Sequence, residues 1–358
     1  MNTYLDKLMN SSDDGELNEL SREYLEKKED FVIKDNIDYP DPEYLIAIRD
    51  TPTMPRGNLV ALSAKWKNGK TFFCDIISAV FLGTDRFPGL RSLRLRGKVQ
   101  VFDTEQAVSD TARIRNIIKR LTGERRNEDF EVFCLRNALI DKINDDDKEV
   151  SRYEFIEQSI KHYNPDLVII DGIADLIYNY NDVIESQQVV NNLAALANEM
   201  NCCIVVVMHQ NKSRQDKSMK GHLGTMLFQK CSDVFNIEKV SNLFIVSHAV
   251  SRHRQCDDFI FKIDAEGIPE DASADKREAD MLRQQQEGMK VADAIKIVMT
   301  ADEEIKRKDI VKRMTERGIC GSSQAYKIVN EAIENGVIVT RGGVLYSIAA
   351  QHCSDLAT

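Results

Sequence analysis

The stretch Asn58–Leu82, NLVALSAKWKNGKTFFCDIISAVFL, decides the fold of this 358-residue chain. It opens with an apolar run, Leu59–Ser63, which predicts a buried strand, and closes with a second apolar run, Phe72–Leu82, which predicts a helix. Between them lies Ala64–Thr71, AKWKNGKT, which has the form of the phosphate-binding pattern GxxxxGK[ST]. A strand, such a loop and a helix in this order predict backbone N–H groups and a helix N-terminus arranged around a phosphate.

Each part of this loop has an expected role. Gly69 lets the backbone bend toward phosphate oxygens, Lys70 neutralises the β- and γ-phosphates, and the Thr71 hydroxyl binds Mg²⁺. The expected nucleotide-binding residues are Ala64, Lys65, Trp66, Lys67, Asn68, Gly69, Lys70, Thr71 and Phe72. Ala64 replaces the first glycine of the pattern, and because alanine tolerates positive φ poorly, we expect altered loop geometry or nucleotide affinity.

Two carboxylates follow predicted strands. Leu167–Ile170 ends in Asp171, which we expect to hold Mg²⁺ together with Thr71. Gly172 follows where many P-loop ATPases place a glutamate, so the catalytic base must come from elsewhere. The strand Val99–Phe102 ends in Asp-Thr-Glu, and Glu105 is the expected base. In the alternative interpretation Asp103 or Thr104 caps the next helix and Glu105 only supports it.

Polar residues also follow the apolar run Ile204–Met208. We expect His209 or Gln210 to hydrogen-bond the γ-phosphate or the attacking water and to report the loss of that phosphate. A purely structural histidine is the alternative.

Strands and helical stretches alternate along the centre of the chain. Besides those above, the predicted strands are Val234–Glu238, Phe244–Ala249 and Phe259–Ile263, and the predicted helices are Ala112–Leu121, Tyr153–His162 and Gln187–Glu199. Apolar strands alternating with helices predict an α/β fold: a mostly parallel sheet with helices on both faces. The later strands follow one another closely and predict an antiparallel or mixed extension of the sheet edge.

Composition shifts divide the chain into four parts. Residues 1–45 form an acidic N-terminal arm, 46–268 the α/β domain, 269–290 a charged linker that is helical in part, and 291–350 a winged helix-turn-helix. In the last part we expect helices at Val291–Met299, Arg307–Arg317 and Ser322–Glu334, followed by a hairpin of Val337–Thr340 and Val344–Ile348 around two glycines.

Taken together, the motifs AKWKNGKT, FDTEQ, LVIIDG, VVVMHQ, KGHLG and VSRHR resemble the RecA-like ATPases. The resemblance is to the plasmid RepA type of hexameric replicative helicase and its relatives on mobile elements, over about residues 45–268. It implies ATP and Mg²⁺ as cofactors, a homo-oligomer with a hexamer favoured, and Glu105 as the base. Arg252 and Arg254 match residues that reach a neighbouring subunit's nucleotide in such proteins. A solvated pair at a strand end is the alternative for these two arginines.

DNA is the expected partner, at two places. A loop after Met208 carries Lys212, Arg214, Lys217 and Lys220, which in RecA-like rings faces the channel that holds single-stranded DNA. This loop has no aromatic residue, so it offers no base stacking. In the C-terminal unit the residues expected to contact duplex DNA are Ser323, Gln324, Tyr326, Lys327 and Arg341. A solvated loop and a protein-interaction module are the respective alternatives.

The bulk numbers limit the remaining possibilities. The net charge is −10, so binding of nucleic acid requires a local basic patch. No apolar run is long enough to cross a bilayer, the N-terminus resembles no export signal, and the eight cysteines form no CxxC pair. We therefore expect a cytoplasmic protein with no membrane contact. Three functions are open: a replicative helicase, an ATP-switched regulator that binds DNA without translocating, and a nucleotide-binding scaffold for protein interaction.

Overall fold

A computed structural model describes residues 32–94, 96–123, 128–136, 151–211, 218–299, 304–317, 319–341 and 344–347. The chain divides into two units, Met1–Pro42 and Glu43–Thr358. In the described part of the first unit, residues 32–42, a turn is closed by hydrogen bonds from the backbone N–H of Ile37 to the Lys34 carbonyl and from the Lys34 N–H to the Tyr39 hydroxyl.

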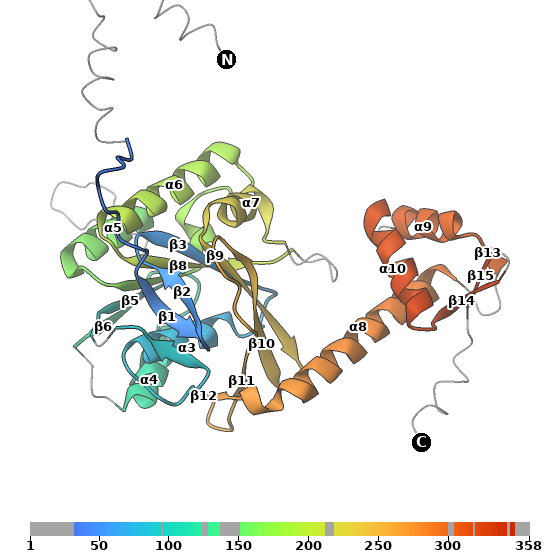
Figure 1. Ribbon diagram of the computed structural model, residues 1–358, viewed down its shortest axis with the longest axis horizontal. Helices are drawn as coiled ribbons and strands as arrows, with labels where there is room; N and C mark the ends of the chain where they lie inside the picture. Colours follow the sequence, from blue (N-terminus) through green and yellow to red (C-terminus); the bar gives the residue numbers. More distant parts are fainter. Residues whose placement is uncertain are drawn as a thin grey trace, which may run out of the picture. The chain divides into compact units, whose positions relative to one another are not determined.

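A nine-stranded sheet forms the centre of the second unit (Figure 1), in the order β12-β11-β10-β9-β3-β8-β7-β5-β6. Six neighbouring strands are parallel, and their bounds are β9 (Asp233–Val240), β3 (Asn58–Ala64), β8 (Cys203–His209), β7 (Leu167–Asp171), β5 (Val99–Asp103) and β6 (Phe130–Cys134). The strands β10 (Leu243–Ser251), β11 (Phe259–Ile263) and β12 (Pro269–Asp271) extend it in antiparallel fashion. The predicted mixed sheet is therefore confirmed.

Helices cover both faces of this sheet (Figure 1). The helices α3 (Lys70–Phe81) and α4 (Val108–Thr122) pack on one face, around Leu62, Val101 and Ile169. The helices α5 (Arg152–Tyr163), α6 (Val183–Glu199) and α7 (Gly221–Lys230) pack on the other face, around Ala61 and Ile170. Because successive residues of a strand point to opposite faces, a continuous apolar strand supplies both cores.

A small second sheet was not predicted. It has the order β2-β1-β4, with β1 (Tyr44–Ile48) paired antiparallel to both β2 (Thr51–Pro55) and β4 (Leu90–Ser92). The two prolines in β2 indicate a loop from sequence alone, but β2 is an edge strand, where a missing N–H donor is tolerated.

The expected linker at 269–290 is not a free connection. β12 joins the large sheet, and after a 3-10 turn at Ser273–Asp275 the helix α8 runs unbroken from Lys276 to Val298. Near its start, Ala279 packs with Ile245 and Ile260, and Arg283 pairs with Glu238 and Asp258. The same helix therefore closes the sheet edge and continues into the C-terminal unit.

The C-terminal unit has its own core. The last turns of α8, α9 (Arg307–Glu316) and α10 (Ser322–Glu334) pack around Ile310, Val329 and Ile338. A three-stranded sheet of order β13-β15-β14 completes it, from β13 (Glu304–Ile305), β14 (Ile338–Arg341) and β15 (Val344–Ser347). Three helices followed by a hairpin is the order that the winged-helix interpretation requires; that interpretation stays a prediction.

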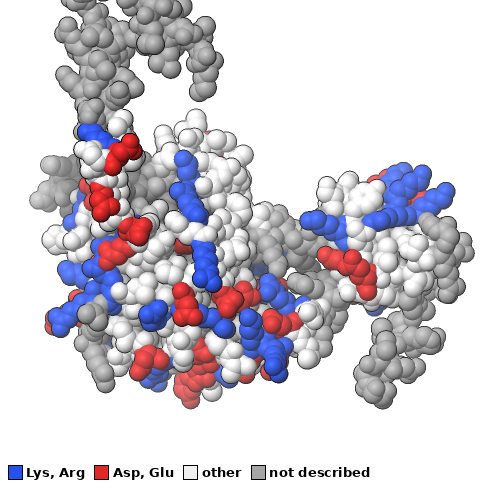
Figure 2. All heavy atoms as spheres, viewed as in Figure 1, with Lys and Arg blue, Asp and Glu red and all other residues white. Residues whose placement is uncertain are grey.

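Acidic and basic side chains are mixed on the face that Figure 2 shows, rather than separated into large areas of one sign. The net charge of −10 is therefore compatible with small local clusters of lysine and arginine. None of the described helices has the length and apolar character that crossing a membrane requires.

Candidate active site

The phosphate loop connects β3 directly to α3. Ala64 lies at the end of β3, paired with His209 and Ile237, and is fully buried. It is absent from the non-glycine residues with positive φ, among which Lys67, at 61°, is the one from this loop. Ala64 therefore needs no positive φ, because this position belongs to the strand and not to the bend. The expected effect on nucleotide affinity stays a prediction.

The bend itself requires Gly69. Its φ is 79°, and a Cβ atom at this position would lie 2.6 Å from Cδ1 of Phe244. Both the left-handed backbone and the ring above it exclude other residues. Gly69 is also the N-cap of α3, so the helix begins at Lys70, two residues earlier than predicted. Lys70 and Thr71 thus occupy the first turn, where the partial positive charge of the helix favours an anion.

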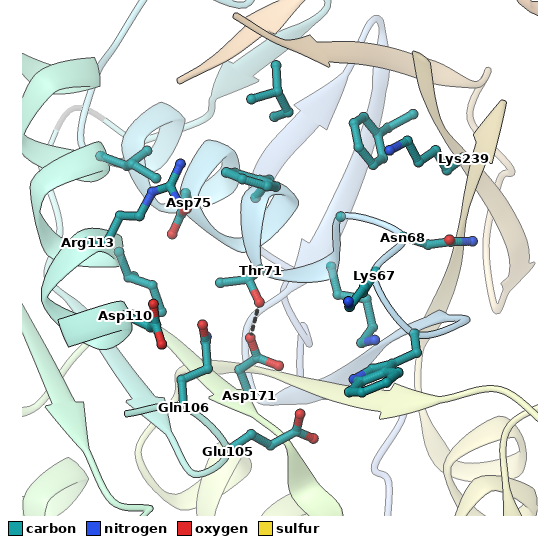
Figure 3. Close-up of a pocket in the computed structure, with 18 of the residues that line it drawn as sticks. Lys67, Asn68, Thr71, Asp75, Glu105, Gln106, Asp110, Arg113, Asp171 and Lys239 are labelled. Atoms are coloured by element: carbon teal, nitrogen blue, oxygen red, sulfur yellow. Dashed lines mark hydrogen bonds between the residues drawn. The ribbon is translucent and has the colours of Figure 1, made fainter. Parts of the chain in front are cut away.

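Strand ends bring the other polar groups to the same edge of the sheet. In the register of the parallel strands, Asp103 pairs with Asp171 and Ala64 with His209. Because carboxyl ends of parallel strands meet at one edge, residues distant in sequence surround the loop (Figure 3). Together with the phosphate loop they line a cavity of about 570 Å³.

The magnesium ligands predicted from sequence lie in contact. The Thr71 hydroxyl donates a hydrogen bond to Oδ2 of Asp171 over 2.7 Å (Figure 3). A hydroxyl and a carboxylate oxygen side by side are the hard ligands that Mg²⁺ prefers, so these residues fit the ion. The pKa of Asp171 is raised to about 6, mainly by burial; the Thr71 hydrogen bond and Lys70 act to lower this pKa, and the charges of Glu105 and Asp103 act to raise it.

His209 lies between Lys70 and Glu105, the two groups for which the sequence predicts catalytic roles. Lys70 Nζ lies 3.0 Å from His209 Nδ1, and His209 Nε2 lies 3.2 Å from Oε1 of Glu105. Because an ammonium group only donates, Nδ1 accepts, and the ring proton of a neutral His209 is on Nε2, facing Glu105. This hydrogen bond lowers the pKa of Glu105, whereas burial lowers the pKa of Lys70 against the opposing charges of Asp171 and Glu105.

Three polar residues at the end of β5, Asp103, Thr104 and Glu105, make different contacts. Asp103 accepts hydrogen bonds from the N–H groups of Glu105 and Gln106 and from the Thr111 hydroxyl. The Thr104 hydroxyl bonds the backbone of Gly172. Asp103 and Thr104 thus shape the loop, but neither caps α4, whose N-cap residue is Ala107, so the capping alternative is wrong. Glu105 does not share their structural role, because its carboxylate faces the cavity.

Gly172 leaves the space that Glu105 fills. A Cβ atom on Gly172 would lie 2.4 Å from Oε1 of Glu105. No side chain is compatible with this position of Glu105. The glycine after Asp171 and the glutamate after β5 therefore depend on each other: the Glu105 carboxylate occupies the space that a side chain at position 172 would need.

The remaining predicted site residues lie outside the cavity or outside the described residues. Gln210 is turned aside, toward Asn236 on β9 over 3.3 Å. Arg252 donates to the Lys230 carbonyl of its own chain over 2.8 Å, whereas Arg254 is exposed and has no hydrogen bond or ion pair with the described residues. Ser323, Tyr326 and Lys327 lie on α10, with Arg307 over the Tyr326 ring at 5.7 Å. Lys212, Arg214 and Lys217 lie outside the described residues, as do the side chains of Gln324 and Arg341.

Half of the residues that line the cavity were not predicted from the sequence. The residues added by the structure are Asp75, Gln106, Asp110, Arg113, Ile114, Ile117, Lys239, Asn242, Phe244 and Ile263. Asp75 had a signal, because it stands four residues after Thr71 and so on the same face of α3. Lys239, Asn242 and Phe244 had none, because they reach the loop through the return of β10 beside β9.

The fold and this loop define a P-loop nucleotide-binding domain. The AAA domain family matches residues 29–215, and the chain belongs to that family. The crystal structure of the RadB recombinase is similar in fold over 62% of this chain and 94% of that chain, with 18% sequence identity and a TM-score of 0.44. No curated protein matches the chain.

Proposed function

We propose that this chain hydrolyses ATP with Mg²⁺ at the cavity around Gly69–Thr71. The observation that carries the proposal is the position of Glu105, whose carboxylate faces Lys70 across His209 and fits into the space left by Gly172. A phosphate-binding loop alone binds nucleotide; a carboxylate placed opposite its lysine also supports hydrolysis.

Each residue has a distinct part in the proposed reaction. Lys70 and the N–H groups of the loop bind the β- and γ-phosphates, and Glu105 accepts a proton from the attacking water. Thr71 and Asp171 hold Mg²⁺, which supplies positive charge against the phosphates. His209 exchanges its contact with Lys70 for one with the γ-phosphate when ATP is bound.

We further propose that the protein is oligomeric and handles DNA, with a RepA-like replicative helicase as the best single function. The resemblance in motif order supports this proposal, and so does the exposure of Arg254, which a residue acting on a neighbouring subunit's nucleotide requires. Single-stranded DNA is the partner in the ring channel, and duplex DNA is the partner proposed for the winged helix of residues 291–350.

An ATP-switched regulator that does not translocate is the second candidate. The observation that favours it is His209, which contacts both Lys70 and Glu105 and so occupies a hydrogen-bonding position on each. Such a site hydrolyses slowly until a partner moves the histidine.

The rate of phosphate release with and without single-stranded DNA tests these proposals. We expect Mg²⁺-dependent turnover that Lys70→Ala lowers at least about 10²-fold, since one electrostatic donor to the transition state is worth about that much. Stimulation by single-stranded DNA together with strand separation supports the helicase, and slow turnover with tight duplex binding supports the regulator. Turnover that is unchanged in Lys70→Ala contradicts the ATPase proposal itself.

A further inference from the structure

The segment that carries Arg254 follows β10 at the end of that strand away from the phosphate loop. Ser251 of β10 pairs with Asp233 of β9, which in turn pairs with Val60 of β3. Val60 stands four residues before Ala64, so at about 3.3 Å per residue the row of Ser251 lies about 13 Å from the row in which the phosphate loop begins. Arg254 follows three residues later, is exposed, and lies outside the lining of its own nucleotide cavity.

This exposed segment is nevertheless held at both ends by side chains of β10. The N–H of His253 donates to the Ser251 hydroxyl over 3.1 Å, and the N–H of Cys256 donates to Nδ1 of His248 over 3.1 Å. The two accepting side chains are themselves bound, because the Ser251 hydroxyl and Nε2 of His248 each donate to Oδ1 of Asp233 over 3.0 Å. Neither His253 nor Cys256 belongs to β9 or β10, so these bonds fix the segment as well as joining the two strands.

The two ring nitrogens of His248 have opposite parts in this chain of hydrogen bonds. A backbone N–H only donates, so Nδ1 accepts, and the ring proton of a neutral His248 is on Nε2, directed to Asp233. The His248 side chain is 0% exposed and stacks on the Phe235 ring with 4.4 Å between the centroids. The imidazole is therefore held in one orientation, and a side chain that lacks the acceptor and the donor breaks the chain of bonds.

Two irregularities of the backbone surround Asp233. The Met54 N–H donates to Oδ2 of Asp233 over 3.2 Å, although Met54 has a φ of 60°, which bulky residues rarely adopt. The pairing of β10 with β9 shifts its register between His248 and Val250, and a bulge of this kind bends a strand and redirects its side chains. Strained backbone of the first kind persists where the surroundings hold it, and it is concentrated at functional sites.

We propose that Asp233 is a positioning residue for Arg254: through His248 and Ser251 it fixes the place at which this arginine stands out from the subunit. The inference rests on the part of the proposed function in which Arg254 acts at a neighbouring subunit's nucleotide. A guanidinium stabilises the charge on a transferring phosphate from a defined place, and a misplacement of about 1 Å costs about 10²-fold in rate. An exposed arginine meets that requirement when its backbone is fixed.

Ser251→Ala removes one of the two links and leaves the core intact, since Ser251 is only half-buried. We expect turnover of ATP to fall about tenfold or more while nucleotide affinity stays at the wild-type value, because the variant's own cavity is complete. Phosphate release and nucleotide titration measure the two effects. Ser273→Ala is the matched control, with wild-type turnover expected: its hydroxyl also donates to an aspartate, Asp271, but beside the outermost strand β12.

Mixing of subunits separates a displaced Arg254 from general damage. A Ser251→Ala subunit has an intact nucleotide cavity and a misplaced arginine, so Lys70→Ala subunits, which hold Arg254 correctly, are expected to restore part of the turnover. Arg254→Ala subunits are expected to restore none, because they supply no arginine. His248→Phe keeps a ring stacked on Phe235 but breaks the second link, and we expect it to behave in the same way.

The outcomes separate this inference from the proposed function. If Arg254→Ala is slow and Ser251→Ala turns over at the wild-type rate, the inference is overturned and the proposed function stands. A slow Ser251→Ala protein that Lys70→Ala subunits do not restore also overturns the inference, because the damage then lies in its own cavity. If Arg254→Ala itself turns over at the wild-type rate, the action of this arginine on a neighbour fails and the inference fails with it. Should His248→Phe not fold, Ser251→Ala decides alone.

Discussion

At the scale of single residues, the site depends on two places where a side chain is absent. Gly69 admits the Phe244 ring above the phosphate loop, and Gly172 admits the Glu105 carboxylate beside Asp171. In both cases the side chain that fills the space comes from a distant part of the sequence: Phe244 lies on β10 and Glu105 follows β5. Neither contact can therefore be predicted from the sequence around the glycine alone.

Gly172→Ala tests the second of these contacts. The added methyl group would lie 2.4 Å from Oε1 of Glu105 and must displace it. Because a misplacement of about 1 Å costs about 10²-fold in rate, we expect turnover of ATP to fall by that order while nucleotide affinity persists. Steady-state phosphate release and nucleotide titration measure the two effects. Gly321→Ala is the control, since nothing lies within 4 Å of its Cβ position; equal turnover in both variants would refute the contact.

The buried side chain of Asp75 lowers the free energy of unfolding by an amount that depends on pH. Its side chain is 1% exposed, and both carboxylate oxygens are without a partner among the described residues. Burial raises the pKa of Asp75 well above its usual range, and the negative charge of Asp171 raises it further. A carboxyl with a raised folded pKa binds more protons when folded, so the free energy of unfolding falls as pH rises above about 4.

Replacing Asp75 by asparagine removes this titration. We expect the stability advantage of Asp75→Asn over the wild type to grow as the pH rises above about 4, in urea unfolding at each pH. The exposed Asp85 offers the control, Asp85→Asn, which we expect to follow the wild type. A constant difference between Asp75→Asn and wild type at all pH values would be inconsistent with a raised pKa.

At the scale of elements, the sequence predicted what local pattern determines. The strands β3, β5, β7 and β8 are apolar runs that end in polar residues, so both the sheet and Thr71, Glu105, Asp171 and His209 were predictable. The β2-β1-β4 sheet was not predicted, because the prolines there indicate a loop and long-range pairing overrides them. The continuity of α8 from Lys276 to Val298 was not predicted either, because the charged residues there indicated a linker that was helical only in part. For the same reason the β9–β10 wall of the cavity was missed.

A buried hydrogen-bond group holds β10 to β9 and β2. Asp233 accepts from His248 Nε2 and the Ser251 hydroxyl, each over 3.0 Å, and from the Met54 N–H over 3.2 Å. We expect Asp233→Ala to lower the free energy of unfolding by about 3 kcal/mol, because buried donors lose their acceptor. Asp233→Asn keeps one oxygen acceptor and should lose less. Urea unfolding measures the stability of both variants. An Asp233→Ala variant as stable as the wild type would show that these hydrogen bonds do not stabilise the packing of β10 on β9 and β2.

At the scale of the whole molecule, Arg254 makes no hydrogen bond or ion pair with the residues that the structure describes. Arg252 is bound to the Lys230 carbonyl, but Arg254 is exposed beyond the end of β10. We predict that Arg254 completes a neighbouring subunit's site, since an arginine supplied in trans is worth about 10³-fold or more in rate.

Mixing of variants tests this prediction. Arg254→Ala and Lys70→Ala are each expected to be inactive alone and to recover part of the ATPase rate when mixed, because the mixed assembly contains sites with an intact Lys70 and a neighbour's Arg254. Arg252→Ala is the matched control: because Arg252 is bound within its own chain, we expect this variant to hydrolyse ATP without a second variant. Activity of Arg254→Ala alone at the wild-type rate would show that the site is complete within one chain.

The central claim is that Glu105 is the catalytic base of an ATPase, and single-turnover hydrolysis of ATP by Glu105→Gln tests it most directly. The amide keeps the size of the side chain but does not accept the proton, so we predict Mg²⁺-ATP binding close to that of wild type and a chemical step slower by about 10²- to 10⁴-fold. Glu157→Gln, which changes an ion-paired glutamate on α5, is the control. A Glu105→Gln protein that hydrolyses bound ATP as fast as the wild type and Glu157→Gln would contradict the account.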